Sequence, residues 1–153
     1  MHLYPVGRLD KDTRGLILLT NDGELTYRLT HPKFEHEKEY LVTINSRLTT
    51  NAKESLKKGI QLDDGITYPA KIKELGISPL FQYSIIIHEG RKRQLYRMFA
   101  RLGHSVLSLK RIRVGGLPLG NLKEGEVREL RTTDLKQLVY STKQDTPKDG
   151  VYK

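Results

Sequence analysis

Cysteine is absent from the 153 residues of this chain. Without it the chain has no disulfide and no thiolate nucleophile, and nothing in the composition indicates secretion. No apolar run reaches the ~18 residues that a membrane-spanning helix needs, and the first residues show no signal-peptide pattern. These absences predict a cytoplasmic protein that has no membrane partner.

Motifs for metals and for nucleotide cofactors are also missing. The histidines show neither HxH nor HxxxH spacing, and no cysteine joins them, which argues against a metal site. Walker, GxGxxG and GxSxG sequences are absent, so we expect no metal, no nucleotide cofactor and no serine-hydrolase chemistry. The five histidines are His2, His31, His36, His88 and His104.

Positive charge is what the chain has in excess. Lys and Arg number 27 against 18 Asp and Glu, which gives a net charge of +9 and a pI of about 9.7. An excess of this size indicates a polyanionic partner. Without a membrane signal, that partner is expected to be RNA or DNA; the alternative is a basic surface that serves only solubility.

Apolar patterning predicts one domain with more strands than helices. Helices are expected after a cap at Asn21 or Asp22, between a threonine cap and a stop at Gly59, over 91–102, and near 133–140. Neighbouring strands without crossover helices favour an α+β fold, with a largely antiparallel mixed sheet flanked by helices. Residues 141–153 resemble a flexible tail. Strands are expected at 16–20, 36–44, 67–75, 80–88, 105–114 and 127–131.

Basic residues are densest between residues 88 and 113. Gly90 is expected to open the helix at 91–102, whose first turn is basic, and backbone N–H groups beside guanidinium groups suit a phosphate. The alternative is that these charges face water. The residues predicted here to bind RNA are Arg91, Lys92, Arg93, Arg97, Lys110 and Arg111.

One carboxylate stands out in the stretch GRLDK. Asp10 lies between Arg8 and Lys11, and neighbouring cations favour its charged form. An ionised carboxylate can act as a nucleophile or a base. Composition alone does not distinguish this role from that of a helix cap or a turn residue.

Four stretches follow one another between residues 4 and 140: VGRLDKDTRGLILLTNDGEL, HPKFEHEKEYLV, GIQLDDGITYPA and IHEGRKRQLYRMFARLGHSVLSLKRIRVGGLPLGNLKEGEVREL. In order and spacing they resemble the RNA pseudouridine synthases of the RsuA/RluB/RluE/RluF group. The resemblance implies an isomerase that converts uridine to pseudouridine in RNA without a cofactor. It also implies that 1–140 form the catalytic domain, without the usual N-terminal RNA-binding module and first strand.

The resemblance assigns roles to individual residues. Asp10 matches the catalytic aspartate, and Tyr40 matches the tyrosine that stacks on the flipped base and moves a proton. Arg8 matches an arginine that displaces the target nucleotide, although a plain phosphate contact is an alternative. Leu109 matches the apolar wall across the base, and core packing explains Leu109 equally well. Without the resemblance, a core aromatic of a strand is the preferred explanation of Tyr40.

One position departs from the family pattern. Tyr96 stands where these enzymes usually carry a basic residue that ion-pairs with the catalytic aspartate, which places Tyr96 beside the expected uridine pocket. Arg97 is one residue away, a rotation of about 100 degrees on a helix, and does not substitute in place. The open alternatives are a cation from Arg8, Arg91 or Arg93, a hydrogen bond from Tyr96 itself, or weakened activity.

The expected partner is ribosomal RNA, and the middle block favours the large subunit. Two other functions remain open at this point. One is an RNA-binding domain of the same fold with weak or no catalysis. The other is a glycoside-cleaving hydrolase, which needs a second carboxylate such as Asp12 or Asp22 to work with Asp10. Family analogy suggests a monomer.

Overall fold

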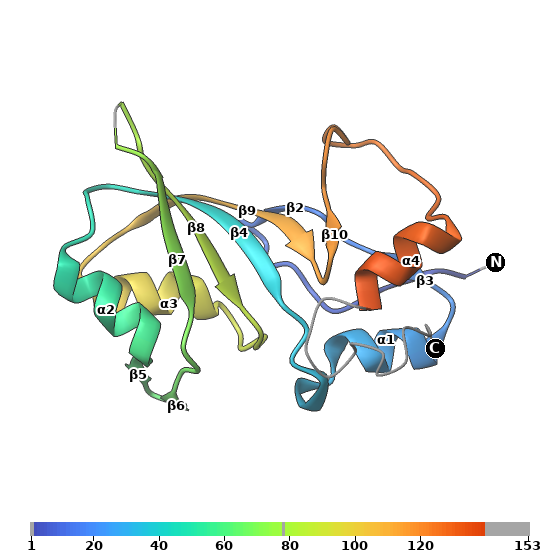
Figure 1. Cartoon of the computed structure of the whole chain (residues 1–153), viewed down its shortest axis with the longest axis horizontal. Helices are drawn as coiled ribbons and strands as arrows, with labels where there is room; N and C mark the ends of the chain where they lie inside the picture. The colour runs from blue at the N-terminus through green and yellow to red at the C-terminus, as the bar shows by residue number, and fades with distance from the viewer. Residues whose placement is uncertain (1, 78, 140–153) are drawn as a thin grey trace.

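The computed structural model describes residues 2–77 and 79–139 (Figure 1). Six strands form the central sheet, and all but one of their pairings are antiparallel, as predicted; β2 runs parallel to β9. The order across the sheet is β10 (Leu117–Pro118), β9 (Val106–Val114), β4 (Lys38–Ile44), β8 (Phe81–Ile87) and β7 (Lys71–Gly76), with β2 (Arg14–Gly15) on β9.

Two short strand pairs and five helical segments complete the fold. The strand pairs are β1 (Tyr4–Pro5) with β3 (Leu19–Thr20), and β5 (Gln61–Leu62) with β6 (Gly65–Ile66). The helices are α1 (Gly23–Thr30), the 3-10 turn η1 (Pro32–Phe34), α2 (Thr50–Lys58), α3 (Gln94–Arg101) and α4 (Thr132–Val139). Helices α2 and α3 lie together at one end of the sheet, and α1 and α4 lie at the other (Figure 1).

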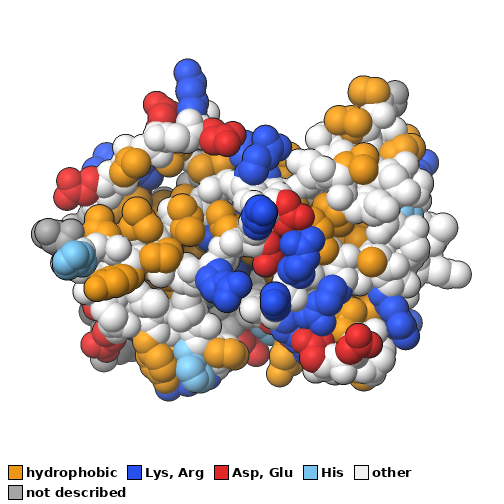
Figure 2. All heavy atoms as spheres, turned by 180° about the vertical axis from the view of Figure 1, so that it is seen from behind, with side chains coloured by type: hydrophobic (Ala, Val, Ile, Leu, Met, Phe, Trp, Pro, Cys, Tyr) orange, Lys and Arg blue, Asp and Glu red, His pale blue; other side chains and the backbone are white. Residues whose placement is uncertain are grey.

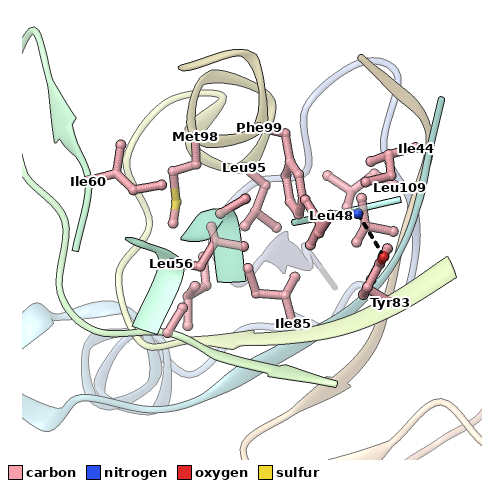
Figure 3. Close-up of a cluster of buried hydrophobic side chains, with 14 of the residues drawn as sticks. Ile44, Leu48, Leu56, Ile60, Tyr83, Ile85, Leu95, Met98, Phe99 and Leu109 are labelled. Atoms are coloured by element: carbon pink, nitrogen blue, oxygen red, sulfur yellow. Dashed lines mark hydrogen bonds between the residues drawn. The ribbon is translucent and has the colours of Figure 1, made fainter. Parts of the chain in front are cut away.

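The first core lies between the sheet and helices α2 and α3. Leu56 of α2 and Phe99 of α3 are fully buried in it, together with Ile85 of β8. Tyr83 is also fully buried, and its hydroxyl accepts a hydrogen bond from the backbone N–H of Leu48 at 2.9 Å (Figure 3). The polar end of the tyrosine is thereby satisfied inside an otherwise apolar cluster.

A second core lies at the other end of the molecule. Leu29 of α1, Leu117 of β10 and Leu138 of α4 are its most buried members, and Leu16 and Leu18 join them from the N-terminal segment. The described residues therefore form two apolar clusters, one with α2 and α3 and the other with α1 and α4.

Local signals placed several helix ends correctly. Asp22 caps α1 by accepting hydrogen bonds from the backbone N–H groups of Glu24 and Leu25. Thr49 caps α2 through the N–H of Ala52, and the helix stops at Gly59. These are contacts between neighbours in the chain, so the sequence contains the information for them.

The prediction of a helix over 91–102 was wrong at its start. Helix α3 begins at Gln94, and Arg93 before it has a left-handed backbone with φ of +49°. The side chain of Gln94 accepts from the N–H of Arg91 at 3.2 Å, and Arg91 itself bonds the carbonyls of Gly65 and Ile66. These long-range contacts hold a turn where the basic first helical turn was expected.

The expected strand at 127–131 was also wrong. Val127 is 89% exposed, and this stretch forms no strand. Arg128 and the N–H of Arg131 instead bond the carboxylate of Asp134 in the first turn of α4. The run at 16–20 is likewise shorter than expected as a strand, since only Leu19 and Thr20 belong to β3.

Gly15 allows β2 to lie close against β9. Its φ is +110°, and a Cβ atom at this position would collide with the backbone carbonyl of Arg111. The N–H of Leu16 donates to the same carbonyl at 2.9 Å. Only glycine accommodates this conformation and this approach together, and the result is a fixed attachment for the segment that carries Asp10.

Candidate active site

A pocket of about 330 Å³ opens between the two cores. Leu18 and Leu29 of the second core line one side, and Ile87 and Leu109 of the first core line the other. The volume lies near the lower end of the range typical of small-ligand sites. The pocket is where an apolar wall and several ionisable groups meet.

Asp10 enters this pocket on a segment that is held at both ends. Before it, the N–H of Val6 donates to the carbonyl of Leu18 at 2.8 Å, and Gly7 turns the chain with a φ of +73°. After it, the N–H of Thr13 donates to the carbonyl of Asp10 at 2.9 Å and closes a turn. Both Asp10 and Thr13 line the pocket.

The Asp10 carboxylate is not tied to another side chain among the described residues, although its charge interacts with Arg93 at longer range. Within residues 2–77 and 79–139 it forms no ion pair and accepts no hydrogen bond. The side chain is nevertheless half-buried. A carboxylate that is placed in a pocket and left without a structural partner is available to a ligand, unlike a carboxylate that caps a helix.

Tyr40 and Arg111 lie across from each other on β4 and β9 and both line the pocket. Arg111 is only 3% exposed, and its Nε donates to the carbonyl of Leu16 at 2.8 Å. Burial raises the pKa of the Tyr40 phenol, while Arg111 opposes that rise and the Asp10 charge adds to it. The phenol is therefore neutral near pH 7, and a buried cation lies beside it.

Lys38 adds a second half-buried cation to the pocket. It lies two residues before Tyr40 on β4, so both side chains are on the same face of the strand. Burial and then the charge of Arg111 lower the pKa of Lys38 to about 8. Sequence reasoning missed this residue, although strand alternation around Tyr40 could have indicated it.

Cations outnumber carboxylates around the pocket. Five basic residues and two acidic residues line it, which suits a phosphate-bearing ligand. The acidic residues are Asp10 and Glu89, and the basic residues are Arg8, Lys38, Arg91, Lys92 and Arg111.

Glu89 differs from Asp10 because its carboxylate is fully engaged. It accepts from Arg91 Nε at 3.0 Å, from Gln94 Nε2 at 2.8 Å and from the N–H of Tyr68 at 2.9 Å. These contacts fix the turn before α3. Of the two acidic residues that line the pocket, only Asp10 is left for chemistry.

Several predicted RNA-binding arginines are held by carboxylates of the protein. Arg97 pairs with both oxygens of Asp64 at 2.9 and 3.2 Å, and Arg93 pairs with both oxygens of Asp12 at 2.8 and 3.1 Å. Neither arginine lines the pocket. Their charges are locally balanced, whereas Lys92 is exposed at the pocket.

The structure brings most of the predicted site residues together. One predicted pocket residue, Tyr96, lies outside the pocket lining, and the predicted RNA-binding residue Lys110 lines a neighbouring cleft beside Arg14 and Lys123. The predicted residues that share the pocket are Arg8, Asp10, Tyr40, Arg91, Lys92, Leu109 and Arg111.

The two carboxylates predicted as hydrolase partners of Asp10 lie elsewhere. Asp22 caps α1, and Asp12 is bound to Arg93 with its side chain 53% exposed. Neither lines the pocket with Asp10. The arrangement does not favour the two-carboxylate chemistry of glycoside hydrolysis.

One face of the molecule, like the pocket, carries more basic than acidic side chains. Figure 2 shows Lys and Arg side chains gathered across the middle of one face, with a few acidic side chains among them.

In the described part of the chain, no helix has the length and apolar character needed to cross a membrane.

Sequence comparison identifies the family of the chain. Residues 1–101 match the profile of the RNA pseudouridylate synthases. The chain therefore belongs to the RNA pseudouridylate synthase family.

Individual relatives narrow the family to the RsuA/RluB group. The chain is 46% identical over 139 residues to ribosomal large subunit pseudouridine synthase B of Bacillus subtilis, with 89% of this chain and 57% of that protein covered. It is 41% identical over 140 residues to ribosomal small subunit pseudouridine synthase A of Escherichia coli K12, covering 90% and 59%. The chain thus spans somewhat more than half the length of these relatives.

A solved structure shares the fold. It is a crystal structure of a pseudouridylate synthase, 40% identical, which superposes with a TM-score of 0.84 over 89% of this chain and 59% of that chain. The α+β fold predicted from the sequence is thereby confirmed as that of a pseudouridine synthase domain.

Proposed function

We propose that this chain isomerises uridine to pseudouridine in ribosomal RNA, with Asp10 as the catalytic aspartate and residues 1–140 as the catalytic domain. The observation that supports the proposal most strongly is the unengaged Asp10 carboxylate in a basic pocket. The RNA target and the cytoplasmic location are part of the proposal, as is a monomeric state. The greater identity to a large-subunit enzyme than to a small-subunit enzyme favours a large-subunit target.

The reaction leaves the composition of the nucleotide unchanged. The bond between C1′ and N1 breaks, the uracil turns within the pocket, and a new bond joins C1′ to C5. The C5 hydrogen leaves as a proton, and N1 takes up a proton. Because no water enters the product, a pocket that excludes water favours isomerisation over hydrolysis.

Asp10 has two chemical routes to the broken bond. Its carboxylate can attack C1′ and hold the sugar covalently, or it can remove the proton at C2′. In either route the neutral Tyr40 phenol presents a flat ring to the flipped base, and Arg111 beside it stabilises negative charge on the detached uracil. Leu109 closes the apolar side of the pocket.

The target uridine has to leave its stack to reach Asp10. Flipping costs a few kcal/mol and is least costly in a loop or bulge. Arg8, exposed at the pocket, is placed to occupy the vacated position or to bind the adjacent phosphate. Lys92, which also lines the pocket, adds a second phosphate contact.

Tritium release from RNA labelled at uridine C5 tests the proposal directly, because the new bond displaces that hydrogen. Wild-type chain should release tritium from unmodified ribosomal transcripts, and Asp10→Asn should release none while binding the same RNA. Release by both proteins would contradict the role of Asp10. Binding without release by the wild type would instead favour an RNA-binding domain, the second candidate, which the tyrosine at position 96 supports.

A further inference from the structure

Position 96 is where the family resemblance leads us to expect a basic residue paired with the catalytic aspartate. In this chain the residue is Tyr96, and it does not reach Asp10 directly. Its hydroxyl lies 2.9 Å from Thr13 Oγ1, and the N–H of Thr13 donates to the carbonyl of Asp10 at 2.9 Å. Tyr96 is therefore linked to the aspartate through the turn that carries it.

Arg93 makes a second connection to the same turn. Its guanidinium group lies 4.2 Å from the centre of the Tyr96 ring, and both of its terminal nitrogens donate to the carboxylate of Asp12. The hydrogen bond from Arg93 lowers the pKa of Asp12, and Tyr96 lowers it further. Two consecutive residues after Lys11, Asp12 and Thr13, are thus both held.

The backbone conformation of Arg93 indicates that its contacts with Tyr96 and Asp12 stabilise the structure. A non-glycine residue with φ of +49° is uncommon, and its conformation is unfavourable. In that conformation the guanidinium group covers the Tyr96 ring and meets Asp12 with two hydrogen bonds. The stacked and bidentate contacts offset the unfavourable backbone.

The other end of the connection is anchored in the first core. Tyr96 belongs to α3, and Leu95, Met98 and Phe99 of that helix are buried. A turn fastened to α3 is consequently fastened to a helix that is packed into the first core. The turn at 10–13 would otherwise depend on its own backbone hydrogen bond and on the attachment at Leu16.

We infer that Tyr96 is a positioning residue that, with Arg93, fastens the Asp10–Thr13 turn to helix α3 and so holds the Asp10 carboxylate in place for reaction. The inference rests on the proposed function. Tyr96 does not line the pocket, so it acts on the turn and not on the RNA. Holding a reactive group in one geometry raises the rate of the chemical step without strengthening substrate binding.

The test compares Tyr96→Phe with Thr13→Val and with the double variant. Each single change removes the hydrogen bond between the two side chains while keeping their shape. The single-turnover rate should fall about fivefold in either variant, the effect of losing one hydrogen bond, with RNA affinity unchanged in Tyr96→Phe. The double variant should be no slower than Thr13→Val alone, since both changes remove the same bond.

Tyr27→Phe is the matched control. Tyr27 is an exposed tyrosine of α1 that contacts Lys33 and Phe34 through its ring. Its hydroxyl can be removed without touching the turn, so its single-turnover rate should equal that of the wild type. Melting temperatures of all variants distinguish a change of the turn from a general loss of stability.

Amide hydrogen exchange at Thr13 provides a readout that does not depend on activity. The exchange should be faster in Tyr96→Phe than in the wild type and unchanged in Tyr27→Phe. Unchanged exchange at Thr13, or a wild-type rate in Tyr96→Phe, would overturn the inference and leave the proposed function standing. Absence of tritium release from the wild type would overturn the proposed function and, with it, this role of Tyr96.

Discussion

Tyr40 and Arg111 face each other across β4 and β9, and a buried guanidinium group therefore lies next to the phenol that lines the pocket. The unusual feature of this pair is the burial of a charged group: Arg111 is only 3% exposed, and it donates a hydrogen bond to the carbonyl of Leu16. The sequence suggested Arg111 as one of several surface cations for RNA. Its burial at the pocket gives it a structural and electrostatic role there, and its contact with RNA stays a prediction.

Replacing Arg111 by Gln should weaken the fold and change the titration of Lys38. The carbonyl of Leu16 loses a buried donor, so the free energy of unfolding should fall by about 1–3 kcal/mol. The pKa of Lys38, now about 8 because of burial and the charge of Arg111, should rise. Chemical denaturation measures the free energy of unfolding, and the pH dependence of Lys38 acylation measures its pKa. Arg101→Gln, a change at an exposed arginine, is the control and should alter neither. An unchanged pKa of Lys38 would contradict the proximity argued here.

Lys38 should make the stability of the protein depend on alkaline pH. The folded lysine has a pKa of about 8 and the unfolded lysine one near 10.5, so between these values the unfolded state binds more protons. The free energy of unfolding of the wild type should therefore rise, relative to Lys38→Met, as the pH increases from 8 to 10.5. Urea titrations of both proteins across this range measure it. Between pH 5 and 7 the two proteins should differ in free energy of unfolding by a constant amount. If that difference stayed constant up to pH 10.5, the prediction would be wrong.

Gly15→Ala should be strongly destabilising. The substitution forces a side chain into a φ of +110° and against the Arg111 carbonyl, which should reduce the free energy of unfolding by more than the roughly 1–3 kcal/mol of backbone strain alone. Gly23→Ala is the matched control, because nothing lies within 4 Å of its Cβ position and it opens α1. That change should be neutral or slightly stabilising. Equal midpoints of thermal unfolding for the two variants would contradict this account of the contact between β2 and β9.

RNA affinity should fall steeply with salt, and its dependence should distinguish free cations from paired ones. Lys92→Gln removes an exposed charge at the pocket and should reduce the salt slope by about one. Arg97→Gln removes a charge that Asp64 already balances and should reduce it less. Fluorescence anisotropy with a labelled ribosomal fragment at several salt concentrations measures both slopes. A flat dependence for the wild type would count against RNA as the ligand.

The sequence predicted those features that depend on neighbouring residues. The caps at Asp22 and Thr49 and the stop at Gly59 are set by side chains a few positions away. The resemblance to a family also led to Asp10, Tyr40 and Leu109, which the fold brings to one pocket. Their roles in catalysis remain predictions that the experiments above test.

The missing strand at 127–131 reflects contacts a few residues apart, from Arg128 and Arg131 to Asp134. Other errors come from contacts between distant parts of the chain. The turn at 91–93 is fixed by Gly65, Ile66 and Glu89, which local periodicity does not reveal. The ion pair of Arg93 with Asp12 joins residues 81 positions apart, so the charge on Arg93 looked free in the sequence. Lys38 was missed for the same reason, because its pKa depends on its burial and on Arg111 across the sheet.

The position of the pocket between two cores has a consequence for protein synthesis. Its lining extends from Val6 to Val114, and the second core also needs Leu138 of α4, close to the end of the described chain. A growing polypeptide that already carries Asp10 therefore has no site until nearly all of these residues have been made. Under the proposed function, activity therefore requires the finished domain and not the Asp10 segment alone.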